Sequence, residues 1–283
     1  MTFVRNARAR RASLRVDPAN RRIVLTEDGY LITNAHVVQN AQQVTVELHN
    51  RLRYSASLVG YDLMEDLAVL KINADGLVPA QFGDSGALRC GDPVAALGDS
   101  LGYQGTFTDG IISALDREMD VDGVNMTLIQ TSAAINFGNS GGPLFNQYGQ
   151  VVGVTTIKVL AEDGSAESMG FAIPSARVKY VAEQLIAGNE VRLGVFGFSV
   201  STIPVEEGGL ELLSLEENSD ALAQGMRPGD IIQAINGQPV NSVQELSRTK
   251  QGLGPGDKVM VTFLRDGVSY TLEVALVDAE LGD

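Results

Sequence analysis

Residues 138–142 read Gly-Asn-Ser-Gly-Gly and place Ser140 in a loop between glycines. Glycine permits backbone conformations that hold a hydroxyl at the tip of a tight turn, with nearby N–H groups aimed at one point. A glycine-rich loop alone is a weak signal, because most such loops are only turns. The loop therefore makes Ser140 a candidate nucleophile, and the rest of the chain must supply its partners.

The position of the histidines decides which fold could hold this serine. The loop also fits the Gly-x-Ser-x-Gly pattern of α/β-hydrolases, but those enzymes carry their histidine after the serine. Here both histidines, His36 and His49, precede Ser140. The subtilisin order needs an acid before the histidine, and only three acids precede His36, all in an unpromising start. The order histidine, aspartate, serine of the chymotrypsin-like fold fits.

The local sequence selects one histidine and one acid. His36 lies in TNAHVV, at the end of an apolar strand, whereas His49 lies between polar neighbours in ELHNR. Asp66 opens the apolar run LAVLKI, where its carboxylate would reach the edge of the core and need a partner such as an imidazole N–H. Its neighbour Glu65 is expected to face solvent. We therefore predict a catalytic triad of His36, Asp66 and Ser140.

Short apolar runs extend on both sides of the loop, from about residue 23 to residue 173. They are rich in Val, Ile and Thr and are separated by Gly, Asn or Asp, which is typical of the strands of a sandwich or barrel. Examples are YLITNAHVV, QVTVEL, LAVLKI, DPVAALG, GTFTDGIISAL, MTLIQT, GQVVGVTTI and MGFAIP. One helix is expected after them, capped by Ser175 and ended by Gly188. Its predicted apolar face is Val178, Val181, Leu185 and Ile186.

A second pattern follows residues 188–190. PGD at 228–230 predicts a turn, and Asn236 with Gly237 predicts a tight turn between two short strands. The box SVQE at 242–245 predicts the start of a helix. The runs KVMVTFLR and YTLEVALV predict two final strands joined through Asp266 and Gly267.

Charge and composition exclude several classes of protein. The chain has a net charge of −14, but residues 1–22 carry seven Arg and one acid, so the other 261 residues hold 14 basic and 34 acidic side chains. An acidic body argues against a nucleic-acid partner, and we interpret the Arg-rich start as disordered, the alternative being a nucleic-acid or membrane arm. No apolar run of 18 residues and no secretory signal is present. Two separated histidines and Cys90, interpreted as a small apolar strand residue, predict no metal site.

Five motifs in order resemble the HtrA/Deg family of serine proteases. They are TNAHVV (33–38), EDLAVLKI (65–72), GIISAL (110–115), QTSAAINFGNSGGPL (130–144) and GFAIP (170–174). The resemblance covers about residues 23 to 280 and implies an all-β dominated fold. It predicts a trypsin-like double β-barrel over residues 23–187, followed by a PDZ domain, β-sandwich-like with two helices, over 188–283.

The resemblance also assigns roles to further residues. The oxyanion hole would be the backbone N–H groups of Gly138 and Ser140, with Asn139 between them. Ala134 would form the base of the primary specificity pocket, which predicts cleavage after small or medium aliphatic residues. Its walls would be Thr155, Thr156, Ile157, Met169, Gly170 and Phe171. In the PDZ domain, Val195, Phe196, Gly197 and Phe198 would bind a peptide carboxylate. Val243 and Leu246 would either face that peptide or only pack against the PDZ core.

The function that the resemblance implies is serine endopeptidase activity, without a cofactor, on unfolded or misfolded proteins of the cell envelope. Two alternatives stay open: a catalytically impaired PDZ scaffold with chaperone-like binding, and a hydrolase of small esters, which the PDZ domain disfavours. Family members form homotrimers through an N-terminal region that carries a Gly-Ser-Gly segment. Residues 19–22 read Ala-Asn-Arg-Arg at that place. We therefore expect a chain truncated or frame-shifted near residue 22, without the first barrel strand and the trimer contacts.

Overall fold

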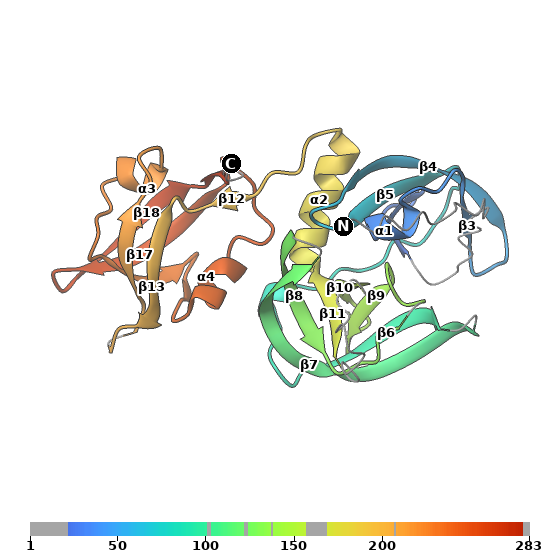
Figure 1. Cartoon of the computed structure of the whole chain (residues 1–283), viewed down its shortest axis with the longest axis horizontal. Helices are drawn as coiled ribbons and strands as arrows, with labels where there is room; N and C mark the ends of the chain where they lie inside the picture. The colour runs from blue at the N-terminus through green and yellow to red at the C-terminus, as the bar shows by residue number, and fades with distance from the viewer. Residues whose placement is uncertain are drawn as a thin grey trace, which may run out of the picture.

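The computed structural model describes residues 22–100, 103–121, 124–136, 138–156, 169–206 and 208–279 of the chain. Figure 1 shows two domains on either side of helix α2 (Ser175–Ala187) and the segment that follows it. Strands dominate both domains, which confirms the fold class expected from the short Val-, Ile- and Thr-rich runs. The expectations for the Arg-rich start lie outside the described residues, except at Arg22.

The first half of the N-terminal domain is an antiparallel sheet in the order β1-β2-β5-β4-β3. Its strands are β1 (Ile23–Val24), β2 (Tyr30–Thr33), β3 (Val44–Glu47), β4 (Arg53–Asp62) and β5 (Leu67–Ile72). The LAVLKI run forms the central strand β5, and five of its six residues are buried. The one-turn helix α1 (Ala35–Val38) follows β2 and carries His36, which was expected at the end of a strand. Within the described residues this sheet has two edges, β1 and β3.

The second half of the domain is a closed barrel in the order β10-β11-β8-β7-β6-β9. Its strands are β6 (Pro93–Ser100), β7 (Tyr103–Val121), β8 (Val124–Thr131), β9 (Pro143–Asn146), β10 (Val151–Thr156) and β11 (Gly170–Pro174). The short 3-10 helix η1 (Ser85–Ala87) precedes β6. Cys90 lies in the turn between η1 and β6 and is exposed, so its placement in a strand was wrong.

Helix α2 joins the two halves. Val178, Val181 and Leu185 are buried in a core that also contains Leu67 of β5 and Ile173 of β11. Burial of these side chains from both sheets holds the halves together, and the catalytic candidates lie along the same junction. The prediction of the apolar face was wrong at one position only, because the side chain of Ile186 is 38% exposed.

The two ends of α2 differ in how well the sequence predicted them. Gly188 caps the C-terminus in the left-handed conformation, with φ of 75°, as expected. The N-cap is Pro174, not Ser175, and it makes no side-chain cap. Ser175 Oγ instead donates to the carbonyl of Gly83 at 2.8 Å, so its hydroxyl serves a long-range contact.

The C-terminal domain is a sheet in the order β13-β14-β15-β17-β18, with β16 paired to β15. Its strands are β13 (Phe198–Pro204), β14 (Leu210–Leu215), β15 (Ile231–Ile235), β16 (Gln238–Pro239), β17 (Lys258–Arg265) and β18 (Val268–Ala275). A separate pair is formed by β12 (Gly194–Val195) and β19 (Val277–Asp278). Two short helices, α3 (Asp220–Ala223) and α4 (Val243–Arg248), complete the domain.

The local signals in this domain predicted its turns correctly. Asn236 and Gly237 have φ of 50° and 75° between β15 and β16, and Asp266 and Gly267 have φ of 51° and 77° between β17 and β18. These values are those of type I′ hairpin turns. Ser242 caps α4 by accepting a hydrogen bond from the Glu245 N–H at 3.1 Å.

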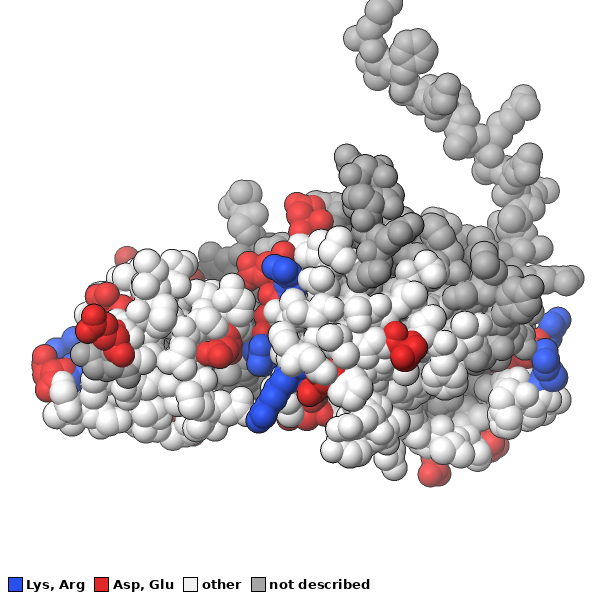
Figure 2. Space-filling view, turned by 90° about the horizontal axis from the view of Figure 1, so that it is seen from below, with Lys and Arg blue, Asp and Glu red and all other residues white. Residues whose placement is uncertain are grey.

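The two domains meet where α4 approaches β7. The buried carboxylate of Asp116 in β7 accepts hydrogen bonds from Arg248 Nε at 2.8 Å and Gln251 Nε2 at 2.9 Å. A cavity of about 100 Å³ lies beside this contact, lined by Glu65 and Arg177 of the first domain and Lys250 and Gln251 of the second. Figure 2 shows one face of the molecule, on which basic side chains gather near the junction between the domains.

Candidate active site

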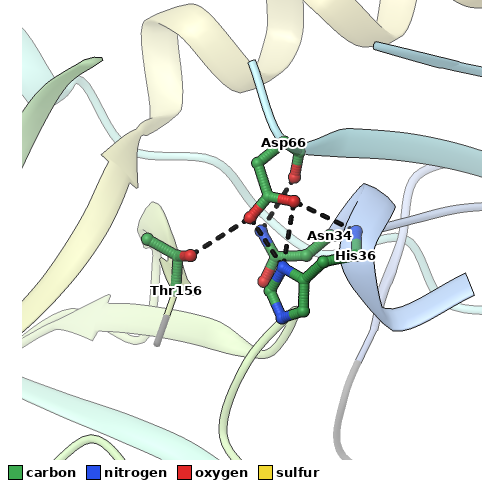
Figure 3. A network of polar contacts seen from close by, with 4 residues as sticks. All are labelled: Asn34, His36, Asp66 and Thr156. Carbon is green, nitrogen blue, oxygen red and sulfur yellow. Dashed lines mark hydrogen bonds and ion pairs between the residues drawn. The ribbon is translucent and has the colours of Figure 1, made fainter. Parts of the chain in front are cut away.

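His36 and Asp66 contact each other directly, as predicted (Figure 3). The Nδ1 atom of His36 lies 2.9 Å from Oδ1 and 2.8 Å from Oδ2 of Asp66. The backbone N–H of His36 also donates to Oδ1 at 3.1 Å. Asp66 is completely buried, and the His36 side chain is 25% exposed, so the far side of the imidazole faces an accessible region.

The backbone around Asp66 is shaped to hold this pair. Asp66 has φ of 51°, a left-handed conformation that a non-glycine residue seldom adopts without support. Its carbonyl accepts hydrogen bonds from the Ala35 N–H at 3.1 Å and from Asn34 Nδ2 at 2.9 Å. These two donors come from the residues just before His36. The chain on both sides of the pair is therefore joined by backbone contacts as well as by the imidazole.

This geometry determines which nitrogen of His36 carries the proton. An ionised carboxylate only accepts hydrogen bonds, so Nδ1 must be the donor to Asp66. The neutral imidazole then has an unprotonated Nε2 with a lone pair on the accessible side. That is the tautomer that a general base needs to take a proton from a serine hydroxyl.

The alternatives weighed from the sequence occupy other positions. His49 is exposed in the turn after β3, as expected. Glu65 does not face solvent, and that expectation was wrong: its carboxylate pairs with Arg177 Nε at 2.7 Å and Nη2 at 2.6 Å. The side chains of Glu65 and Arg177 are only 16% and 10% exposed. This ion pair links the loop before Asp66 to helix α2.

Two neighbouring threonines at the end of β10 connect the acid to the serine loop. Thr156 Oγ1 donates to Asp66 Oδ2 at 3.1 Å, across the junction of the two sheets (Figure 3). Thr155 Oγ1 donates to the carbonyl of Asn139 at 2.5 Å and to that of Gly142 at 3.1 Å. Both threonines are buried. One two-residue segment therefore fixes the orienting acid on one side and the backbone around Ser140 on the other.

Replacing Thr156 with valine is expected to lower kcat on a peptide substrate about tenfold and to leave KM nearly unchanged. Valine keeps the shape of threonine but removes the donor to Asp66, and a hydrogen bond to a charged group is worth about 1.5–3 kcal/mol. Steady-state kinetics on a chromogenic peptide would measure the change. Thr127→Val on β8, at a half-buried threonine outside the proposed site, is the control. An unchanged kcat in Thr156→Val would show that this hydroxyl does not support the acid.

Ser140 lies in a tightly turned, buried loop. The Asn139 N–H donates to the Asn136 carbonyl at 3.0 Å, and the Gly142 N–H donates to the Asn139 carbonyl at 2.8 Å. Gly138 has φ of 128°, so only glycine fits there without strain. Ser140 itself is 4% exposed, and its Oγ has no hydrogen-bond partner among the described residues. A hydrogen bond between Ser140 and His36 is therefore not formed in this structure, and catalytic hydrogen bonds often tighten only when substrate binds.

Asn139, predicted as part of the oxyanion loop, is held by its side chain as well. Its Nδ2 donates to the Ala134 carbonyl at 3.1 Å. The same side chain packs against Gly98 of β6 so closely that a β-carbon at position 98 would overlap it. Sequence reasoning missed Gly98, because a glycine in an apolar strand carries no signal of a neighbour 41 positions away.

The structure brings together part of the predicted specificity pocket. Gly170 of β11 packs against Ala133 and Ile135, on either side of Ala134, and a side chain at position 170 would overlap both. Met169 is 46% exposed, whereas Phe171 is buried in the core beside α2. The hydroxyls of Thr155 and Thr156 are engaged as described above. Ile157 lies outside the described residues.

The residues predicted to bind a peptide carboxylate line one groove in the C-terminal domain. The groove measures about 590 Å³ and is bordered by β13 on one side and α4 on the other. Gly197, which lines the groove just before β13, has φ of 66°. All six predicted residues belong to its lining: Val195, Phe196, Gly197, Phe198, Val243 and Leu246. Phe196 and Leu246 are also buried in the domain core, so the packing role considered for Leu246 is real as well.

Comparisons with known proteins agree with the division into an N-terminal and a C-terminal domain. Residues 23–154 match the family model described as a trypsin-like peptidase domain, and residues 194–276 match that of a PDZ domain. The solved structure of the HtrA-type protease AlgW with tripeptide is 31% identical, with a TM-score of 0.64 over 92% of this chain and 89% of that one. The chain belongs to the HtrA family of serine proteases.

Other serine proteases match over a similar share of this chain. The serine endoprotease from Yersinia pestis is 33% identical, with a TM-score of 0.55 over 92% of this chain and 88% of that one. Serine protease Do-like HtrB from Bacillus subtilis (strain 168) is 40% identical over 89% of this chain. A probable periplasmic serine endoprotease DegP-like from Brucella suis biovar 1 is 37% identical over 89% of this chain. The chain spans 60% and 51% of the lengths of these last two relatives.

Family membership confirms the predicted architecture, a trypsin-like domain followed by one PDZ domain. The boundary placed between residues 187 and 188 stays a prediction. Within the described residues, no helix is both long enough and apolar enough to cross a membrane.

Proposed function

We propose that this HtrA protein is a serine endopeptidase that cleaves unfolded or misfolded polypeptides. The observation that carries the proposal is the link through β10: Thr156 holds Asp66, which holds His36, while Thr155 holds the loop of Ser140. Hydrogen bonds from two neighbouring residues of one strand thus reach both the Asp66–His36 pair and the Ser140 loop, which supports an acyl-transfer role for the three residues. In this proposal the catalytic residues are His36, Asp66 and Ser140.

The proposed reaction follows from the placement of each group. Ser140 Oγ attacks the substrate carbonyl while His36 Nε2 takes its proton, and Asp66 stabilises the imidazolium that forms. The N–H groups of Gly138 and Ser140 bind the negative oxygen of the tetrahedral intermediate. The imidazolium then protonates the leaving amine, and water hydrolyses the acyl-enzyme by the same steps. Substrate binding would move Ser140 and His36 into hydrogen-bond contact.

A fluorophosphonate probe tests the proposal directly, because it reacts only with an activated serine. Labelling of the folded protein at Ser140, lost in Ser140→Ala, supports the enzyme. No labelling of the folded wild-type protein would contradict it and would favour the alternative of a peptide-binding, chaperone-like scaffold.

The pocket around Ala134 is proposed to accept small or medium aliphatic side chains. A neutral, methyl-sized residue at its base supplies no carboxylate for Lys or Arg. We expect a peptide library with varied residues before the cleaved bond to yield products ending in Val, Ala, Ile or Leu. A preference for basic residues at that position would contradict the pocket assignment.

The remaining parts of the proposal concern partners and location. The groove between β13 and α4 is proposed to bind the C-termini of polypeptides by strand addition to β13, an edge strand of its sheet. Because relatives such as that of Brucella suis are named periplasmic, we propose an extracytoplasmic location. The homotrimer implied by the family stays a prediction.

A further inference from the structure

The peptide groove contains one cation that the proposed function does not use. Lys250 follows helix α4 and lines the groove together with Val243, Leu246 and Ser247, the side chains on one face of that helical segment. It also lines the cavity between the two domains, opposite Glu65 and Arg177. Lys250 therefore lies where the peptide groove and the domain junction meet.

The Lys250 ammonium has no direct polar partner among the described residues, although the Glu118 carboxylate is near it. Within the described part of the chain, its ammonium makes no hydrogen bond or ion pair. Burial lowers the pKa of the Lys250 amine, and the nearby Arg177 guanidinium lowers it further, while the carboxylate of Glu118 acts in the opposite direction. Arg177 is already paired with Glu65, so an anion entering the groove would find Lys250 available. Pairing with such an anion would offset both the cost of burying the Lys250 ammonium and its repulsion by Arg177.

Backbone contacts show which end of the groove Lys250 occupies. The Leu253 N–H donates to the Lys250 carbonyl at 3.0 Å, and the Gly194 N–H donates to the Leu253 carbonyl at 3.4 Å. Gly194 immediately precedes the loop of Val195 to Phe198, so Lys250 lies at the carboxylate end and Val243 at the far end. A peptide that ends at Gly197 would place its last side chain beside Lys250.

We propose that Lys250 makes the groove selective for polypeptides whose last residue is acidic, with the side-chain carboxylate of that residue paired to the Lys250 ammonium. The inference rests on the proposed binding of C-termini in this groove. Among the described residues that line the groove, Lys250 is the only Lys or Arg, and three lining residues are acidic: Glu118, Glu216 and Asp278. Asp278 is paired with Arg192 at 2.9 Å, and the two glutamates are exposed. An acidic side chain is therefore favoured where it contacts the Lys250 ammonium directly, and the carboxylates of the lining oppose one that does not.

Fluorescence anisotropy with the full chain carrying Ser140→Ala tests this inference without cleavage of the probe. The probes are labelled heptapeptides that differ only in ending with Glu, Gln or Leu, and a fourth with Glu moved to the preceding position. Side chains alternate along an extended strand, so the moved Glu would point away from Lys250. We expect the Glu-ended peptide to bind about tenfold more tightly than the Gln-ended peptide, and the moved Glu to give no gain.

Variants separate the role of the charge from that of packing. Lys250→Met keeps the aliphatic stem and should reduce the Glu-over-Gln preference to less than twofold, while Lys250→Arg should retain it. Lys258→Met, at an exposed ion pair with Glu273, removes the same charge elsewhere and should leave the preference intact. Equal binding of Glu and Gln peptides by the Lys250 protein, or a preference that survives Lys250→Met, overturns the inference. Failure of every peptide to bind, including the Leu-ended one, overturns the proposed groove itself.

Discussion

Replacing Ser140 with alanine is expected to lower kcat on an unfolded protein or a chromogenic peptide by about 10⁶-fold, the loss seen when the nucleophile of a serine protease is removed. Binding and the N–H groups of the oxyanion loop would leave only slow background hydrolysis. The measurement is the initial rate at saturating substrate, with protein prepared free of host proteases.

The same variant carries a stability expectation that distinguishes loss of chemistry from loss of fold. Ser140 Oγ is buried and has no hydrogen-bond partner among the described residues, so its removal leaves no other group unsatisfied. A buried hydroxyl without a partner costs about 1–3 kcal/mol, and we therefore expect a melting temperature equal to or a few degrees above that of the wild type. Exposed Ser55→Ala on β4 serves as the control, with unchanged activity. Residual activity above one per cent in Ser140→Ala would mean that another group is the nucleophile.

Local signals explain how much of the fold could be predicted. The β-branched runs became strands because their side chains fill a pleated, half-buried surface, and the Asn-Gly and Asp-Gly pairs became hairpin turns because both residues tolerate positive φ. The box at Ser242 and the glycine at position 188 marked helix ends for equally local reasons. The prediction of the apolar face of α2 was wrong only at Ile186, which lies on the border between core and solvent.

Errors arose where a residue's partner is distant in sequence. Ser175 looks like a helix cap, but its hydroxyl contacts Gly83, 92 positions earlier. Glu65 looks like a solvated neighbour of Asp66, but it pairs with Arg177, 112 positions later. No periodicity or propensity encodes such contacts, because they depend on how the sheets and α2 are packed together.

The candidate site followed the same rule: its local motifs were predictable from the sequence, and its long-range contacts were not. The order of His36, Asp66 and Ser140 pointed to the junction, since only one arrangement of serine hydrolases uses that order. The supporting contacts were not predictable: Thr156 was assigned to a pocket wall, and the structure shows its hydroxyl on Asp66. The left-handed backbone of Asp66 and the packing of Asn139 on Gly98 also required three-dimensional information.

The second large effect concerns the acid. Asp66→Asn is expected to lower kcat by about 10⁴-fold while the protein stays folded. The amide has one acceptor oxygen where the carboxylate has two, and three donors converge on the carboxylate: His36 Nδ1, the His36 backbone N–H and Thr156 Oγ1. With the amide NH₂ turned toward Nδ1, the imidazole proton moves to Nε2, and the base loses the lone pair that must accept the serine proton.

Because asparagine matches aspartate in shape, Asp66→Asn should melt close to the wild type, whereas Asp66→Ala should lose activity and also melt several degrees lower. In the alanine variant the donors of His36 and Thr156 lose the carboxylate that accepts from them, and a buried donor left unsatisfied costs about 1–3 kcal/mol. Exposed Asp75→Asn provides the matched control for the change of charge. A kcat within tenfold of the wild type in Asp66→Asn would show that the contact between Asp66 and His36 is structural and that the imidazole is oriented by another group.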